Sequence, residues 1–151
     1  MRKFWSLWMI FWLLIIGAAC EEDDSGGGEL SLNDRQQQIN RLTRTWNADR
    51  ATFEGFDATE EFQGFTITFA EDNTWTATGS NLVFGSQGPW DLDEEDVNLL
   101  RLEGVEVQLT ISPDVRLMQL AFVLAGGSIG SRIQGLSGEY IIEFSTEPEE
   151  D

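Results

Sequence analysis

Residues 64–78, GFTITFAEDNTWTAT, contain two short segments in which apolar and polar side chains alternate. Phe65, Ile67 and Phe69 alternate with threonines, and the alternation resumes around Trp75 after the acidic turn Glu71-Asp72-Asn73. A period of two places the apolar side chains of a strand on a single face. The stretch therefore predicts a β-hairpin that has one buried face.

Six further segments have strand patterns and are separated by Gly, Pro, Asp or Asn. They are residues 81–85, 88–92, 97–103, 105–111, 115–124 and 139–145. The connections are too short for crossover helices, so we expect an antiparallel meander around one hydrophobic core. A closed barrel is favoured because the strand region has no lysine and few prolines to protect open edges. A flattened sandwich of the same strands is the alternative.

One short helix is expected before the strands. Ser31 and Asp34 have the spacing of a capping box, and Leu32, Ile39, Leu42 and Trp46 recur on one helical face. We expect Leu32, Ile39 and Leu42 to pack against the sheet. The solvent side would carry the glutamines at 36–38 and the arginines at 35, 41 and 44. The predicted fold class is all-β, an antiparallel β-barrel or barrel-like sandwich with one short N-terminal helix.

The first twenty residues have the pattern of an export signal. Met1-Arg2-Lys3 is positively charged, residues 4–19 are almost entirely apolar, and the run ends in small residues. At about 16 residues it is shorter than the ~20 that a membrane-spanning helix needs, so a permanent transmembrane anchor is the weaker alternative. Gly17-Ala18-Ala19-Cys20 resembles the lipobox of bacterial lipoproteins, although that motif usually has Leu, Val or Ile where Gly17 stands. We predict a signal peptide over residues 1–19 and a lipid on Cys20; an ordinary signal peptide is the alternative.

Residues 20–30 form an acidic and glycine-rich stretch that cannot bury a core, and we expect a linker there. An acidic run directly after the lipidated cysteine resembles the surface-export signal of Bacteroidota lipoproteins. This resemblance implies attachment to the outer membrane through the lipid, on the cell surface rather than on the periplasmic face, which remains the alternative.

The charge of the mature chain narrows its possible partners. Without residues 1–19 the chain has seven arginines, no lysine, no histidine and 27 acidic residues, which is a formal charge of −20. Such a charge repels nucleic acids and anionic lipids, so the lipid on Cys20 would have to provide membrane attachment. The usual general base, Schiff-base amine and catalytic thiolate are also missing. We therefore expect no enzymatic activity, no catalytic residues and no cofactor.

Several elements in order resemble the lipocalin-like lipoproteins of Bacteroidota over residues 32–145. They are Leu42-Thr43-Arg44-Thr45-Trp46, the hairpin of residues 64–78, Gly88-Pro89-Trp90, Gly104-Val105-Glu106-Val107 and Gly135-Leu136-Ser137-Gly138-Glu139-Tyr140. Members of that family usually have a glycine where Arg44 stands. The resemblance implies a lipocalin-like β-barrel over residues 31–146, followed by an acidic tail over 147–151, and it implies no particular activity.

Two loops invite a site assignment. The acidic run Asp91-Leu92-Asp93-Glu94-Glu95-Asp96 could offer oxygen ligands to Ca²⁺, but it lacks the glycine and the spaced glutamate of an EF-hand, so we expect no metal site there. The glycine-rich segment 126–132 has no lysine and no following helix to bind phosphate. We expect a flexible loop that could fold over a barrel mouth.

The aromatic residues leave two functional classes open. Most occupy period-two positions and should fill the core, whereas Phe53 and Phe56 stand outside a clean alternation and are candidates for a surface contact. The first class is a non-enzymatic binding module for a small apolar molecule, a glycan or a protein partner. The second is a structural or interaction subunit with a packed barrel and no small-molecule ligand. A solvent-connected cavity would favour the first, and a filled interior with an exposed apolar patch would favour the second.

Overall fold

A computed structural model describes residues 32–125, 129 and 137–146 of the chain. Its helices are α1 (Leu32–Leu42) and the 3-10 turn η1 (Thr59–Phe62). Its strands are β1 (Thr45–Phe53), β2 (Phe56–Asp57), β3 (Thr66–Phe69), β4 (Thr74–Thr78), β5 (Gln87–Leu92), β6 (Leu99–Leu102), β7 (Val105–Ile111), β8 (Leu117–Leu124) and β9 (Gly138–Ser145). Within the described residues no helix is long and apolar enough to span a membrane.

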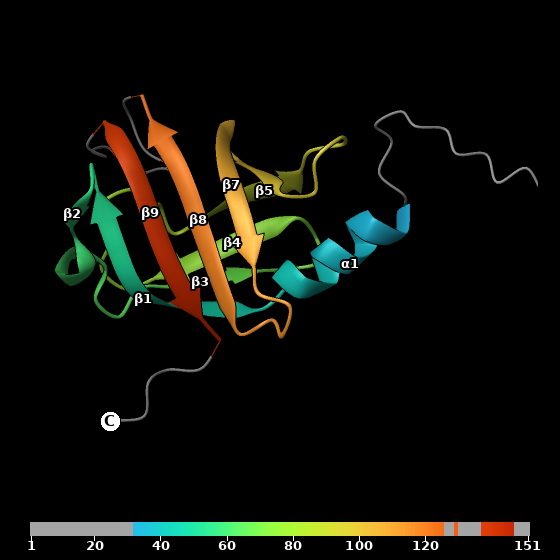
Figure 1. Cartoon of the computed structure of the whole chain (residues 1–151), viewed down its shortest axis with the longest axis horizontal. Coiled ribbons are helices and arrows are strands. Elements are labelled where there is room, and N and C mark those ends of the chain that lie inside the picture. Colours follow the sequence, from blue (N-terminus) through green and yellow to red (C-terminus); the bar gives the residue numbers. More distant parts are fainter. Residues whose placement is uncertain (1–31, 126–128, 130–136, 147–151) are drawn as a thin grey trace, which may run out of the picture.

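The strands form a closed antiparallel barrel, which confirms the predicted fold class. The sheet runs in the order β2-β1-β3-β4-β5-β6-β7-β8-β9, and β9 pairs back onto β1. Eight strands close the barrel and β2 is an additional strand on β1. Figure 1 shows β1, β9, β8 and β7 side by side on one wall, with α1 and β2 at opposite ends of the molecule. Among the strands of the described residues, β2 is the one at the end of the strand order, and it is only two residues long, which limits unwanted strand pairing.

The hairpin of residues 64–78 forms as predicted. Ile67 pairs with Ala77 and Phe69 with Trp75, so their side chains share the inner face. Ile67, Phe69 and Trp75 are fully or almost fully buried, because the period-two pattern directs them all into the barrel. On the outer face, Thr66 and Thr78 are linked through their hydroxyls at 2.7 Å.

The helix is present, but its predicted faces are partly wrong. Leu32 is 88% exposed and is not among the described residues that pack against the core, whereas Leu42 is fully buried and Ile39 packs against the core. Gln38, which we placed in solvent, is buried because its amide bonds to Asn98 across the barrel end. Trp46 belongs to β1 rather than to the helical face. These differences arise because α1 lies against the strand ends, which present carbonyl groups as well as apolar side chains.

One predicted strand is replaced by an inward loop. Residues 81–85 belong to no named strand, and their only recorded β-bridge is a parallel one between Phe84 and Ile129. The other predicted strands are found with ends shifted by up to two residues: for example, β6 begins at Leu99 instead of residue 97, and β8 begins at Leu117 instead of 115. The predicted signal peptide, Cys20, the linker over 20–30 and the acidic tail over 147–151 lie outside the described residues.

Candidate functional site

A continuous chain of aromatic rings runs through the described part of the barrel interior. Neighbouring ring centroids are 4.8 to 5.9 Å apart along the series Phe62, Phe65, Phe84, Phe122, Tyr140 and Phe53. Trp75 and Phe144 branch from this chain, each about 6 Å from a member of it. Such rings pack as densely as the rest of a protein core and leave their neighbours few voids. The interior therefore has the character of a hydrophobic core.

The end of the barrel beside α1 is held by two arginines of that helix. Arg35 donates to the carbonyls of Leu92 and Asp93, at 2.8 and 3.0 Å, and its guanidinium also pairs with Asp91. Arg41 reaches the other side and donates to the last carbonyl of β7 and to the next one, at 2.9 and 2.8 Å. Carbonyl groups at strand ends need hydrogen-bond donors, and a planar guanidinium can serve two at once. Contrary to the prediction, these arginines fasten the helix to the barrel instead of facing solvent.

The opposite end of the barrel is occupied by the loop between β4 and β5. Asn81 is 7% exposed, and its side-chain oxygen accepts hydrogen bonds from the amides of Val83 and Phe84. This turn directs both apolar side chains into the core, where they are buried. Ile129 donates to the Val83 carbonyl at 2.9 Å and accepts from Gly85, so the two loops are joined through their backbones. Ile129 is the one described residue of the glycine-rich segment 126–132; the proposed lid otherwise lies outside the described residues.

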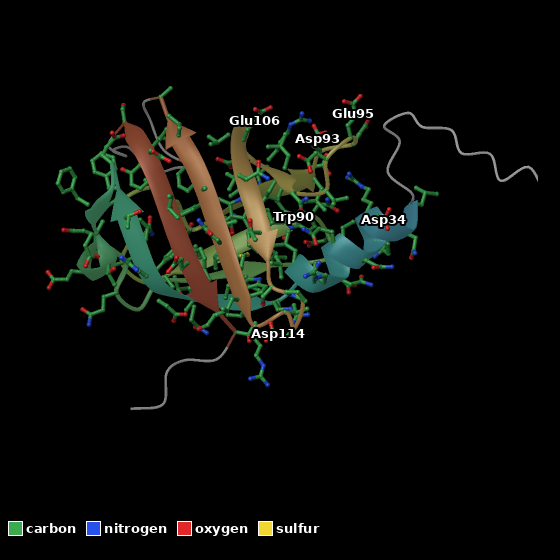
Figure 2. The ribbon with its side chains drawn as sticks, viewed as in Figure 1. Asp34, Trp90, Asp93, Glu95, Glu106 and Asp114 are labelled. Atoms are coloured by element: carbon green, nitrogen blue, oxygen red, sulfur yellow. The ribbon has the colours of Figure 1, made fainter. Side chains whose placement is uncertain are left out.

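The acidic run at residues 91–96 is organised by internal hydrogen bonds. The amides of Glu95 and Asp96 donate to Asp93, and Arg101 pairs with the same carboxylate. The hydrogen bond from Glu95, together with those other donors, holds the pKa of Asp93 below its usual range. Figure 2 shows Asp93 and Glu95 on this turn, on the side of the barrel where α1 lies. Among the residues that the structure describes, no group of three or more potential ligands gathers around a metal position.

The β1–β2 hairpin exposes an aromatic ring at the end of the barrel away from α1. Glu54 and Gly55 both have positive φ, 49° and 79°, as a two-residue type I′ turn requires. Two hydrogen bonds join the turn to β9. The Glu54 amide donates to the Glu139 carbonyl, and the Glu54 carboxylate accepts from the Glu139 amide. Phe56 beyond the turn is 78% exposed. The predicted surface role therefore fits Phe56, whereas Phe53 is half-buried and its ring centroid lies 4.8 Å from that of Tyr140.

A hollow of about 650 Å³ lies beside this hairpin. It is lined by residues 48–50, where β1 has a bulge, and by residues 59–64 of η1 and the turn after it. Asp49, Glu60 and Glu61 provide three carboxylates, and Arg50 provides the one cation among the described lining residues. η1 stays attached to β1 on the other side of the hollow, because the Thr59 hydroxyl is hydrogen-bonded to the backbone of Ala51. We name this hollow together with Phe53, Phe56 and Asp57 the hairpin rim.

Asp57 connects the hairpin to the hollow. Its carboxylate accepts hydrogen bonds from the Thr59 hydroxyl and amide, at 2.6 and 2.9 Å, and Thr59 itself lines the hollow. The hydroxyl bond is the main reason that the pKa of Asp57 lies below its ordinary value, and the positive charge of Arg50 lowers the pKa further. Asp57 is therefore a fixed negative charge at neutral pH.

Three features of the two barrel ends were not predicted from the sequence. They are the hydrogen bonds from Arg35 and Arg41 to strand-end carbonyls, which we call the arginine clamp, the turn at Asn81, and the hollow at the β1 bulge. The Glu54-Gly55 pair was a readable signal for the hairpin, since turn-forming residues flanked by apolar ones indicate type I′ geometry. The contacts of Arg35, Arg41 and Asn81 had no such signal because their partners lie elsewhere in the fold.

Comparisons with known proteins found no matching family model, no similar curated protein and no similar solved structure. The resemblance to lipocalin-like lipoproteins therefore stays a prediction.

Proposed function

We propose that the chain is a lipoprotein held at the cell surface by lipid on Cys20, and that its barrel is a non-enzymatic module which recognises a protein partner through its outer surface. The observation that carries the recognition proposal is the aromatic chain through the barrel, which occupies the volume where a small apolar ligand would otherwise bind. The exposed ring of Phe56 supports the same conclusion. Between the two classes left open by the sequence, we therefore favour an interaction module with a packed interior.

Native mass spectrometry of the protein purified from its own host tests the packed interior. We expect the mass of the lipidated polypeptide, alone or with a protein partner. A stoichiometric small molecule that survives delipidation would contradict the proposal and would favour a ligand carrier instead.

The lipid anchor is supported by the lipobox-like residues and by the charge of the mature chain. Because the formal charge is −20, electrostatic attraction to anionic lipid cannot replace acyl chains, and durable attachment needs two or three of them. We expect metabolic labelling with palmitate in the wild type and none after Cys20→Ser. A wild type that takes up no palmitate and fractionates like the Cys20→Ser variant would contradict the lipoprotein proposal.

Surface exposure is tested separately by protease treatment of intact cells. We expect the wild type to be cleaved while a periplasmic marker stays intact. Protection until the outer membrane is broken would place the protein on the periplasmic face.

A further inference from the structure

We propose that the hairpin rim is the docking site for a cationic peptide segment of a partner protein, with one apolar side chain of that segment against Phe56 and one basic side chain in the adjacent hollow. This inference rests on the proposed function, because it names the partner chemistry of the same outer surface.

The apolar part of the hairpin rim consists of two phenylalanine side chains on one face of the β1–β2 hairpin. Phe53 and Phe56 are directly opposite in the β1–β2 register, so their side chains lie on the same face of the hairpin. One ring is half-buried against Tyr140, and the other is left largely in water. The positive-φ turn and its two hydrogen bonds to Glu139 hold the backbone of the hairpin that carries the exposed ring. An aromatic side chain on a held backbone has only two side-chain torsions to lose on binding, which makes it a suitable interface anchor.

The hollow lies within reach of the same bound segment. Phe56 precedes Thr59 by three residues, so their Cα atoms are at most about 11 Å apart, the span of three or four residues of an extended peptide. The hollow of about 650 Å³ is open to solvent and is large enough for a long side chain. An extended segment that contacts Phe56 is therefore long enough to place a side chain at the Thr59 edge of the hollow.

The charge of the rim selects a cationic occupant. Three carboxylates line the hollow, Glu54 and Asp57 lie close to Phe56 in the hairpin, and Glu139 of β9 is hydrogen-bonded to Glu54. At the α1 end two of the acids are paired with arginines, Asp91 with Arg35 and Asp93 with Arg101. Among the described residues, none of the rim carboxylates has an arginine within salt-bridge distance. Lysine or arginine from a partner would supply the missing counter-charge and would increase the association rate.

The hairpin rim also lies on the side that attachment leaves free. The chain enters the barrel through α1, and Figure 1 places α1 and β2 at opposite ends of the molecule. An anchor before residue 32 would therefore join the barrel at the end away from the rim.

Selection of random twelve-residue peptides by phage display on the full-length lipidated protein tests the inference. We expect enriched peptides to combine Lys or Arg with an aliphatic or aromatic residue and to bind more weakly as salt rises. Phe56→Ser should weaken a selected peptide by about tenfold or more. Glu60→Gln combined with Glu61→Gln should weaken it by about threefold to tenfold.

Matched controls change equivalent residues elsewhere on the surface. Val123→Ser removes another largely exposed apolar side chain, and Glu71→Gln with Glu94→Gln removes two exposed charges near the α1 end. These variants should bind like the wild type. No enrichment, an enriched pool without excess basic residues, or equal binding to Phe56→Ser would overturn the inference. A small molecule in the barrel or an unlabelled Cys20 would contradict the proposed function. The peptide selection would still decide separately whether the hairpin rim binds cationic segments.

Discussion

Phe84 lies at the centre of the aromatic chain, and its truncation to alanine tests whether the barrel interior is a rigid core. The ring is 1% exposed, and its centroid lies 5.3 Å from Phe65, 6.0 Å from Trp75 and 5.9 Å from Phe122. Truncation of a buried Phe costs about 3 to 5 kcal/mol, and more where the site cannot collapse. Here the loop is fixed by the Asn81 side chain and by backbone bonds to Ile129. We therefore expect Phe84→Ala to lower the free energy of unfolding by about 4 to 5 kcal/mol.

Urea unfolding followed by tryptophan fluorescence measures this change, because Trp75 is buried next to the truncated ring. The matched control is Phe56→Ala, which removes the same atoms from a ring that is 78% exposed and should change stability by no more than about 0.5 kcal/mol. If the alanine variant does not fold, Phe84→Leu should still fold and lose about 1 to 2 kcal/mol.

The cavity left by Phe84→Ala provides an independent readout. A dry apolar cavity binds small aromatic molecules, so saturating benzene should raise the unfolding midpoint of the variant and leave the wild type unchanged. A loss below about 1.5 kcal/mol, with no response to benzene, would mean that the rings do not form a close-packed core. In that case the barrel interior could hold a small apolar ligand, and a partner on the outer surface would no longer be favoured over it.

Three further predictions address the barrel ends and the hairpin rim. Arg41→Met leaves two strand-end carbonyls without their donor and should cost about 1 to 3 kcal/mol in urea unfolding; an unchanged midpoint would show that the clamp adds nothing. Gly79→Ala should be more destabilising than Gly104→Ala in the same assay, because both sites have positive φ but only at Gly79 would the new Cβ meet a backbone carbonyl; equal losses would refute this. Thr59→Val removes the main cause of the low Asp57 pKa, which should rise towards the ordinary value in a carboxyl NMR titration; an unmoved pKa would contradict the assignment. Because that pKa is depressed in the folded state, its contribution to stability is complete above the ordinary value of about 3.9 and is lost as pH falls through the folded pKa.

Most of the strands of this protein could be predicted because strand patterns depend on local alternation. β1 was not among the predicted strands, and its pairing with β9, which closes the barrel, joins segments far apart in the chain. Phe65, Ile67 and Trp75 take inward positions in a sheet whatever the rest of the chain does, since successive side chains alternate between faces. The antiparallel order followed from the short connections, which permit no crossover. The exposed position of Phe56 was also foreseen, from its place outside the alternation.

The errors concern residues whose partners are distant in sequence. Polar patterning placed Arg35, Gln38 and Arg41 in solvent, yet their partners lie 56 to 71 residues away at strand ends, apart from the local contact between Gln38 and Arg41. Residues 81–85 were predicted to form a strand because their apolar residues, bounded by turn-forming ones, resemble one. The Asn81 turn and the bridge to Ile129 fold them into the core instead.

By itself, the sequence determined the sheet, the likeness to an exported lipoprotein and the negative charge, all of which depend on residues close together in the chain or on composition alone. Only the tertiary structure decided that a chain of aromatic rings runs through the barrel, that arginines hold α1 to it, and that the β1–β2 hairpin has an acidic hollow beside it. The physical reason is that packing and hydrogen-bond pairing depend on which surfaces meet when the barrel closes, and that meeting is a property of the whole fold rather than of any one segment.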